Sequence, residues 1–163
     1  MNENSAIEPL EPADISANDR TRFRDLVIEA GEVGGPALAT NIANARVLVV
    51  IRAADTIRGV AALKRPQDSY RRKIAKRAKV DLVQSAWPYE LGYIYIEPEL
   101  QGRGLSHRLV AATLEHRDNA GVFATVRADN KRMRATLERA GFTPAGEPYE
   151  GLQGGLIGVL LNA

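Results

Sequence analysis

The stretch Glu90–Ser106, ELGYIYIEPELQGRGLS, decides the fold of this chain. Leu91–Ile96 is apolar at nearly every position, which is typical of a central strand covered on both faces. Glu97-Pro98 then turns the chain, and Gln101–Ser106 opens a helix. A strand, a glycine-bearing loop and a helix N-terminus form a place where backbone N–H groups converge on a phosphate. We therefore predict an anion-binding site here.

The composition indicates one folded domain over residues 1–163, with an ordinary balance of apolar and charged residues. The absence of cysteine excludes disulfides, thiolate zinc sites and a cysteine nucleophile, and it suits a cytoplasmic protein. Because there are only two histidines, His107 and His116, we expect no metal. No apolar run is long enough to span a membrane, and the N-terminus lacks the pattern of a signal peptide, so we expect no membrane partner.

Working outward from the central strand, apolar periodicity and turn residues predict the other elements. Strands are predicted at 6–10, 45–52, 56–63, 91–96, 122–127, 142–145 and 156–161, and helices at about 16–30, 37–43, 69–80, 105–118 and 130–140. Ser16 or Asp19 is the expected cap of the first helix, and Asp129 that of the last. Residues 1–5 are expected to be mobile. The order predicts a mixed α/β fold (α+β, mixed sheet), with parallel pairing where a helix separates two strands.

A basic segment, Lys64–Lys79, lies between the predicted hairpin and the central strand. It holds eight basic residues against Asp68 alone, a net charge of +7, so the rest of the chain carries −5 within a total of +2. Its helix has only a thin apolar stripe, Ile74 and Ala78, which predicts a surface position. The segment is either a solvated helix face or a binding surface for nucleic acid or another polyanion.

The pattern Gln101-x-x-Gly104-x-Ser106 resembles the Q/R-x-x-G-x-G/A signature of the GNAT superfamily of acyl-CoA-dependent acyltransferases. The pattern alone is weak, but the strand before it ends in the proline turn expected of that family. Asn130 and Gly141-Phe142 then follow in the family's order. The resemblance covers about residues 6–161 and is strongest over 90–142. It implies a GNAT-like order, β-α-α-β-β-β-α-β-α-β-β, with residues 64–89 as a basic helical insertion before the central strand.

By this resemblance, acetyl-CoA is the co-substrate, with its pyrophosphate on the backbone N–H groups of the loop and helix start. The physical basis is general, because a helix N-terminus attracts anions and glycine allows close backbone approach. The pantetheine arm would pair with the central strand like an added strand. His107 has two interpretations, a phosphate contact or an exposed helix histidine. The implied cofactor-binding residues are Ile94, Tyr95, Ile96, Gln101, Gly102, Arg103, Gly104, Leu105, Ser106, His107 and Asn130.

The expected reaction is direct acyl transfer from a thioester to a primary amine of a small molecule or a protein. The amine must lose a proton before it attacks, so a base is needed. The chain resembles the ribosomal-protein alanine acetyltransferases in layout, but their glutamate base falls at Thr125 and their tyrosine acid at Leu137. Glu90 is therefore the candidate base. The alternative interpretation is that Glu90 is a solvated carboxylate at the end of a strand. Tyr93 and Tyr95 are expected to pack in the core or line the substrate cleft.

Two functions therefore remain open from the sequence. The first is a cytoplasmic N-acetyltransferase, which the intact loop Gln101–Ser106 favours. The second is a non-catalytic GNAT-fold module that binds nucleic acid or another polyanion through residues 64–79, which the residues Thr125 and Leu137 favour. For the oligomeric state, both a monomer and a homodimer agree with the sequence, and the acceptor amine is left open as well.

Overall fold

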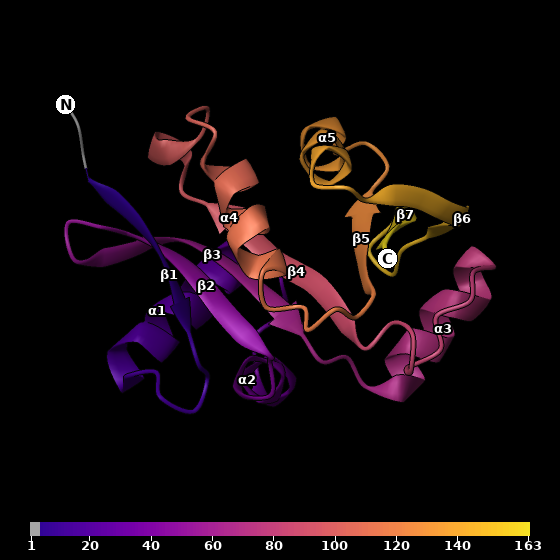
Figure 1. Ribbon diagram of the computed structural model, residues 1–163, viewed down its shortest axis with the longest axis horizontal. Helices are drawn as coiled ribbons and strands as arrows, with labels where there is room; N and C mark the ends of the chain where they lie inside the picture. The colour runs from indigo at the N-terminus through magenta and orange to yellow at the C-terminus, as the bar shows by residue number, and fades with distance from the viewer. Residues whose placement is uncertain (1–3) are drawn as a thin grey trace. The chain divides into compact units, whose positions relative to one another are not determined.

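The computed structural model describes residues 4–163 and has a mixed α/β fold (Figure 1). Within these residues seven strands form one mixed sheet in the order β1-β2-β3-β4-β5-β7-β6, so β4 is the central strand as predicted. The predicted order of helices and strands is confirmed. The strands are β1 Ser5–Leu10, β2 Val47–Ala53, β3 Thr56–Lys64, β4 Tyr89–Ile96, β5 Val122–Arg127, β6 Thr143–Glu150 and β7 Leu156–Asn162. The helices are α1 Ala17–Glu29, α2 Pro36–Ala43, α3 Asp68–Ala78, the 3-10 helix η1 Pro98–Leu100, α4 Leu105–Leu114 and α5 Lys131–Arg139.

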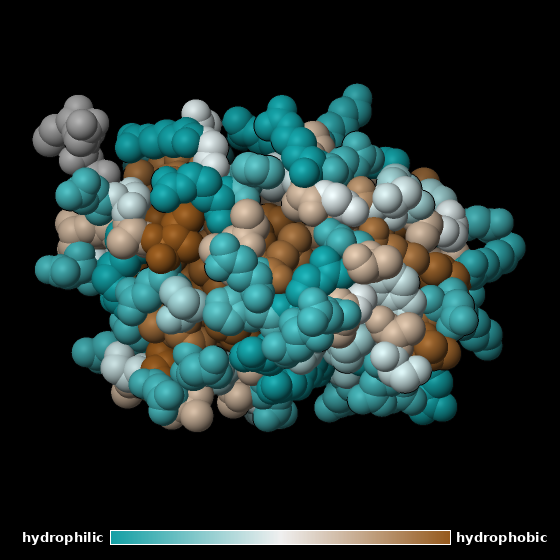
Figure 2. Space-filling model, in the orientation of Figure 1, coloured by the Kyte–Doolittle hydropathy of each residue, from teal (hydrophilic) through white to brown (hydrophobic). Residues whose placement is uncertain are grey.

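The chain divides into two compact units, and β4 passes from one to the other. The first unit comprises the chain up to Lys64 together with Leu91–His116, and the second comprises Arg65–Glu90 together with Arg117–Ala163. The mobile tip predicted for residues 1–5 lies mostly outside the described residues, and Ser5 already belongs to β1. Polar side chains cover most of the face drawn in Figure 2. Over residues 4–163, no helix has the length and apolar character needed to cross a membrane.

The first unit is a layered structure around β1, β2 and β3, which pair antiparallel in chain order. Alternate strand residues such as Leu48 and Val50 pack with Phe23 and Leu26 of α1 and with Ile42 of α2. Helix α4 contacts the same three strands and lies on their other side (Figure 1). Because both faces of β2 are covered, six of its seven residues are buried.

The second unit contains a smaller sheet of β5, β7 and β6. Strand β7 pairs antiparallel with both neighbours, and β5 pairs in parallel with the first residues of β4, through Tyr89–Val122 and Glu90–Phe123. This confirms the parallel pairing expected across α4. On one face of this sheet, Phe123 and Val159 form a cluster with Ile74 of α3. Helix α5 follows β5 and buries Leu137.

Three predicted helix boundaries can be compared with the structure. Ser16 caps α1, because its hydroxyl accepts a hydrogen bond from the Asp19 N–H at 3.1 Å. The cap of α5 is Asn130, whose side chain accepts from the Met133 N–H at 3.1 Å, so the prediction of Asp129 was wrong by one residue. Helix α4 ends at Leu114, earlier than predicted. Asp118 and its neighbour both have positive φ, which an α-helix does not accommodate.

Helix α3 differs from the prediction of a purely surface helix, because Arg71 is buried, with 1% of its side chain exposed. Its guanidinium donates to the carbonyl oxygens of Trp87 at 3.0 Å, Pro66 at 3.2 Å and Pro88 at 3.4 Å. It also pairs with Asp68 at 3.3 Å. A buried cation is stable only when it is paired and hydrogen-bonded, and these four partners meet that requirement. Arg71 thus anchors α3 to the chain that enters β4.

The neighbouring arginines 71 and 72 provide a test of this anchor. We expect Arg71→Ala to lower the free energy of unfolding by about 3 kcal/mol, because it removes a buried cation that serves three carbonyl groups. Arg72 also pairs with Asp68, at 2.9 Å, but 76% of its side chain is exposed. Arg72→Ala should therefore change stability by less than about 0.5 kcal/mol. Denaturant unfolding followed by circular dichroism measures both, and equal effects would show that Arg71 is not an anchor.

Candidate functional site

The turn after β4 is held in place by Glu97. Its carboxylate pairs with Arg22 of α1 and with Arg58 of β3, the latter at 3.3 Å. Its backbone N–H donates to the Arg58 carbonyl at 3.0 Å. Gln101 follows η1 directly, and its side-chain amide donates a hydrogen bond to the Ile96 carbonyl, at 2.8 Å. The loop is therefore fixed to the end of β4 rather than free.

Helix α4 begins without a capping side chain, as the predicted phosphate site requires. Its N-cap residue is Gly104, with φ +74°, and Gly102 has φ +79°, a left-handed conformation that favours glycine. A Cβ built on either glycine would meet no heavy atom within 4 Å, so the space beside the loop is open. Leu105 is buried and fixes the helix start. The uncapped N–H groups and the positive end of the helix dipole suit an anion.

Strand β4 contains a residue in an uncommon conformation, Tyr93, with φ +57°. The ring is packed in the core of the first unit, and the Lys64 ammonium lies 4.4 Å from its centroid. Tyr95 packs on the same core, and its hydroxyl donates to Glu29 at 3.1 Å. Burial, followed by the Glu29 hydrogen bond, raises the pKa of Tyr95. These contacts confirm core packing for both tyrosines.

The other predicted cofactor residues are placed as follows. In β4, Ile96 is buried and Ile94 is half-buried. Ser106 is half-buried in the first turn of α4, and His107 beside it is exposed. Arg103 is exposed and donates to the Glu99 carbonyl at 3.2 Å. These residues all belong to the first unit, whereas Asn130, the cap of α5, belongs to the second.

The candidate base Glu90 is not a solvated carboxylate, because only 2% of the residue is exposed. Its Oε2 accepts a hydrogen bond from the Tyr70 hydroxyl of α3 at 3.0 Å. Its charge also acts on Tyr149 of β6, whose pKa is raised first by burial and then by Glu90. Arg77 of α3 lies over the Tyr149 ring at 5.2 Å and opposes that rise. A buried carboxylate bound to a phenol can accept a proton, so this cluster has the chemistry of an acid–base site.

The sequence did not single out Tyr70. It lies four residues before Ile74, which itself lies four residues before Ala78, so it continues the apolar stripe of α3. That spacing indicates that Tyr70 lies on the packed face of α3, but the many charged residues around it made the pattern easy to overlook. Trp87, in the loop before β4, packs against the core of the second unit.

Much of the charge of the basic segment is engaged within the second unit. Besides Arg71 and Arg72, Lys79 pairs with Glu147 at 3.2 Å, and Arg77 donates to the Glu150 carbonyl at 2.6 Å. The fold thus supplies acceptors that the local sequence lacks. Binding of nucleic acid or another polyanion by Lys64–Lys79 stays a prediction.

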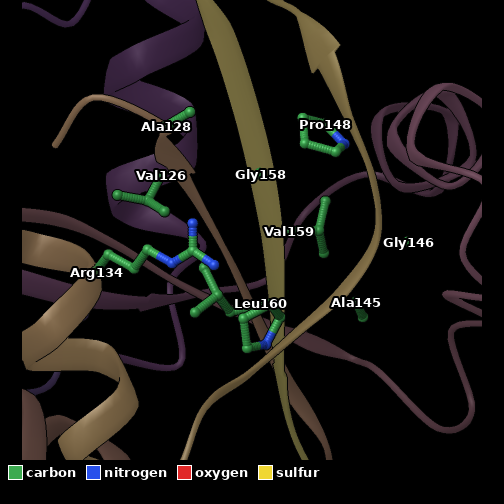
Figure 3. Close-up of a pocket in the computed structure, with 10 residues that line it drawn as sticks. Val126, Ala128, Arg134, Ala145, Gly146, Pro148, Gly158, Val159 and Leu160 are labelled. Carbon is green, nitrogen blue, oxygen red and sulfur yellow. The ribbon is translucent and has the colours of Figure 1, made fainter. Parts of the chain in front are cut away.

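A pocket of about 210 Å³ lies in the second unit (Figure 3). It forms where β6 bulges opposite Gly158, and its lining is apolar except for Arg134 of α5. The Arg134 guanidinium pairs with Glu138 at 3.2 Å. Since its lining holds no acid or base suited to acyl transfer, we assign this pocket no role in the chemistry.

Comparison with known proteins settles the family. The model of the acetyltransferase (GNAT) family matches residues 17–142. This chain belongs to that family. The match includes β4, the glycine loop and α4, so it covers the predicted phosphate site. No curated protein sequence gives a match.

Solved structures share the fold of this GNAT chain at low sequence identity. An acyl-CoA N-acyltransferase from Pseudomonas aeruginosa has a TM-score of 0.68 at 14% identity, covering 98% of this chain and 100% of that one. The ribosomal-protein-S18-alanine N-acetyltransferase from Escherichia coli has a TM-score of 0.65 at 18% identity, covering 97% and 92%. The structure of yncA from Salmonella typhimurium with its cofactor acetyl-CoA has a TM-score of 0.64 at 16% identity, covering 98% and 93%. At these identities the likeness shows the fold alone.

The pKa of Tyr149 tests the acid–base cluster, because Glu90 and Arg77 act on it in opposite directions. We expect Glu90→Gln to lower this pKa, while burial still keeps it above the ordinary value of 10.0. Arg77→Gln should raise it further. A ¹³Cζ-tyrosine NMR titration measures both shifts, with the signal assigned by its loss in Tyr149→Phe. Shifts of the same sign in both variants would contradict the described cluster.

Proposed function

We propose that this protein is a cytoplasmic N-acetyltransferase that moves an acetyl group from acetyl-CoA to a primary amine. The observation that carries the proposal is the start of α4, where two left-handed glycines leave open space beside an uncapped helix N-terminus. Such an arrangement suits a diphosphate. The family shows acyl transfer as the general chemistry, and the yncA structure with its cofactor acetyl-CoA supports the choice of acyl group.

The residues present fit the cofactor. The N–H groups of Gly102–His107 would hold the pyrophosphate, with Arg103 adding positive charge. The backbone of Ile94–Ile96 would pair with the pantetheine arm. Asn130 caps α5 with its side-chain oxygen, which leaves its side-chain amide nitrogen able to donate. When bound, acetyl-CoA supplies an acetyl group activated as a thioester.

Glu90 is the proposed general base. The acceptor arrives mainly as an ammonium ion, and its nitrogen can attack only after a proton is removed. The Glu90 carboxylate would take that proton, after which a carbon–nitrogen bond forms and the carbon–sulfur bond breaks. The second proton lost by the nitrogen ends on the released coenzyme A thiol. Backbone N–H groups of β4 would polarise the thioester carbonyl. The acceptor is a small-molecule or protein amine; among similar structures are a spermidine N-acetyltransferase from Vibrio cholerae and the S18-alanine enzyme.

The proposal predicts that cofactor affinity depends on the charge at position 104. Asn and Asp both tolerate positive φ, so Gly104→Asn and Gly104→Asp carry similar backbone strain. Only the Asp carboxylate repels the pyrophosphate. We expect Gly104→Asp to weaken acetyl-CoA binding about a hundredfold relative to Gly104→Asn.

Isothermal titration calorimetry with acetyl-CoA measures this difference, and circular dichroism confirms that both variants are folded. Equal affinities of the two variants would place the pyrophosphate elsewhere. If the unaltered protein shows no binding at millimolar acetyl-CoA, the enzyme proposal fails, and the non-catalytic module that binds polyanions becomes the better account.

A further inference from the structure

Helix α3 brings Tyr70 to the buried carboxylate of Glu90, and neither the family match nor the phosphate site explains this contact. We infer that Tyr70 is a positioning residue for Glu90: it holds the carboxylate in its ionised form and connects it to solvent for release of the proton. This inference rests on the proposed function, because it assigns Glu90 the role of base. It makes the helical insertion part of the active site.

Burial is the first argument. Glu90 is 2% exposed, and an ionised carboxylate in such a place is costly unless hydrogen bonds stabilise it. The Tyr70 hydroxyl supplies one at 3.0 Å, and hydrogen bonds to a charged group are the strong ones. Tyr70 itself is 40% exposed. The phenol therefore reaches from solvent to a carboxylate that solvent hardly contacts, which gives the proton a route outward.

The second argument is how firmly Tyr70 is held. The next residue, Arg71, is buried and bonds to the carbonyls of Trp87 and Pro88, which lead directly into β4. The first turn of α3 is thus tied to the chain two residues before Glu90. Because the anchor and the phenol are adjacent in sequence, the anchor fixes the distance between the Tyr70 hydroxyl and Glu90.

Three further ionisable side chains of this part of the second unit have partners of their own. Tyr149 of β6 has a raised pKa, and Arg77 of α3 lies over its ring. Asp68 in the first turn of α3 pairs instead with Arg71 and Arg72. Because Asp68 is also a carboxylate, the test must follow the carboxyl signal of Glu90 by itself.

The test compares Tyr70→Phe with Tyr89→Phe. Both remove one phenol hydroxyl that donates to a carboxylate in the same unit, but the Tyr89 hydroxyl donates to Asp118, at 2.8 Å. Loss of the Tyr70 hydroxyl favours the protonated form of Glu90. We expect the midpoint of the Glu90 carboxyl ¹³C NMR titration to move up by about one pH unit in Tyr70→Phe and to stay in place in Tyr89→Phe.

A second readout follows function. With propylamine as acceptor, the rate of thiol release from acetyl-CoA is measured as a function of pH. In Tyr70→Phe the acidic limb of this pH–rate profile should move to higher pH by the same amount, while calorimetry shows unchanged acetyl-CoA affinity. An unmoved NMR midpoint, or an equal shift in Tyr89→Phe, overturns the inference. Failure of the unaltered protein to bind acetyl-CoA would instead overturn the proposed function. The NMR titration would still show whether Tyr70 stabilises the ionised form of Glu90, because it needs no cofactor.

Discussion

The functional interpretation depends on how β4 continues into α4. The chain must leave a strand, turn and enter a helix within nine residues, and it does so with left-handed backbone at Gly102 and Gly104. A capping side chain at the start of a helix is worth about 1 kcal/mol, and α4 does without one. The loop is stabilised instead by the ion pairs of Glu97 and the hydrogen bond from Gln101 to β4. This leaves the helix N-terminus ordered and open to an anion.

The second constraint is the charge on α3. Read along the sequence, the basic segment has almost no compensating acid, which suggests a partner outside the protein. In the folded second unit, backbone carbonyls accept from Arg71 and Arg77, and Glu147 of β6 pairs with Lys79. Clustered charge in a sequence is thus a poor guide to a binding partner until the acceptors that the fold supplies are known. Here it leaves the anchoring of Tyr70 as the clearer role of this helix.

The sequence predicted the parts of the site that are local. The strand 91–96, the proline turn and the helix start lie within one short stretch, so patterning and turn chemistry were enough. It could not predict Arg71 as buried, because the carbonyls that make burial possible belong to residues such as Trp87 that are distant along the chain. Tyr70 was missed for a different reason, because the charged residues around it obscured its place in the apolar stripe of α3. The cap of α5 was misplaced because Asp129 and Asn130 are adjacent and both suit that position.

The central claim is that the N-terminus of α4 binds the cofactor's pyrophosphate. The most direct measurement is a ¹⁵N–¹H NMR titration of the labelled protein with acetyl-CoA. The account predicts that the backbone amide signals of Gly102–His107 shift most and saturate together, because their N–H groups donate to the phosphates. Saturable shifts confined to α3, with those six amides unmoved, would contradict it.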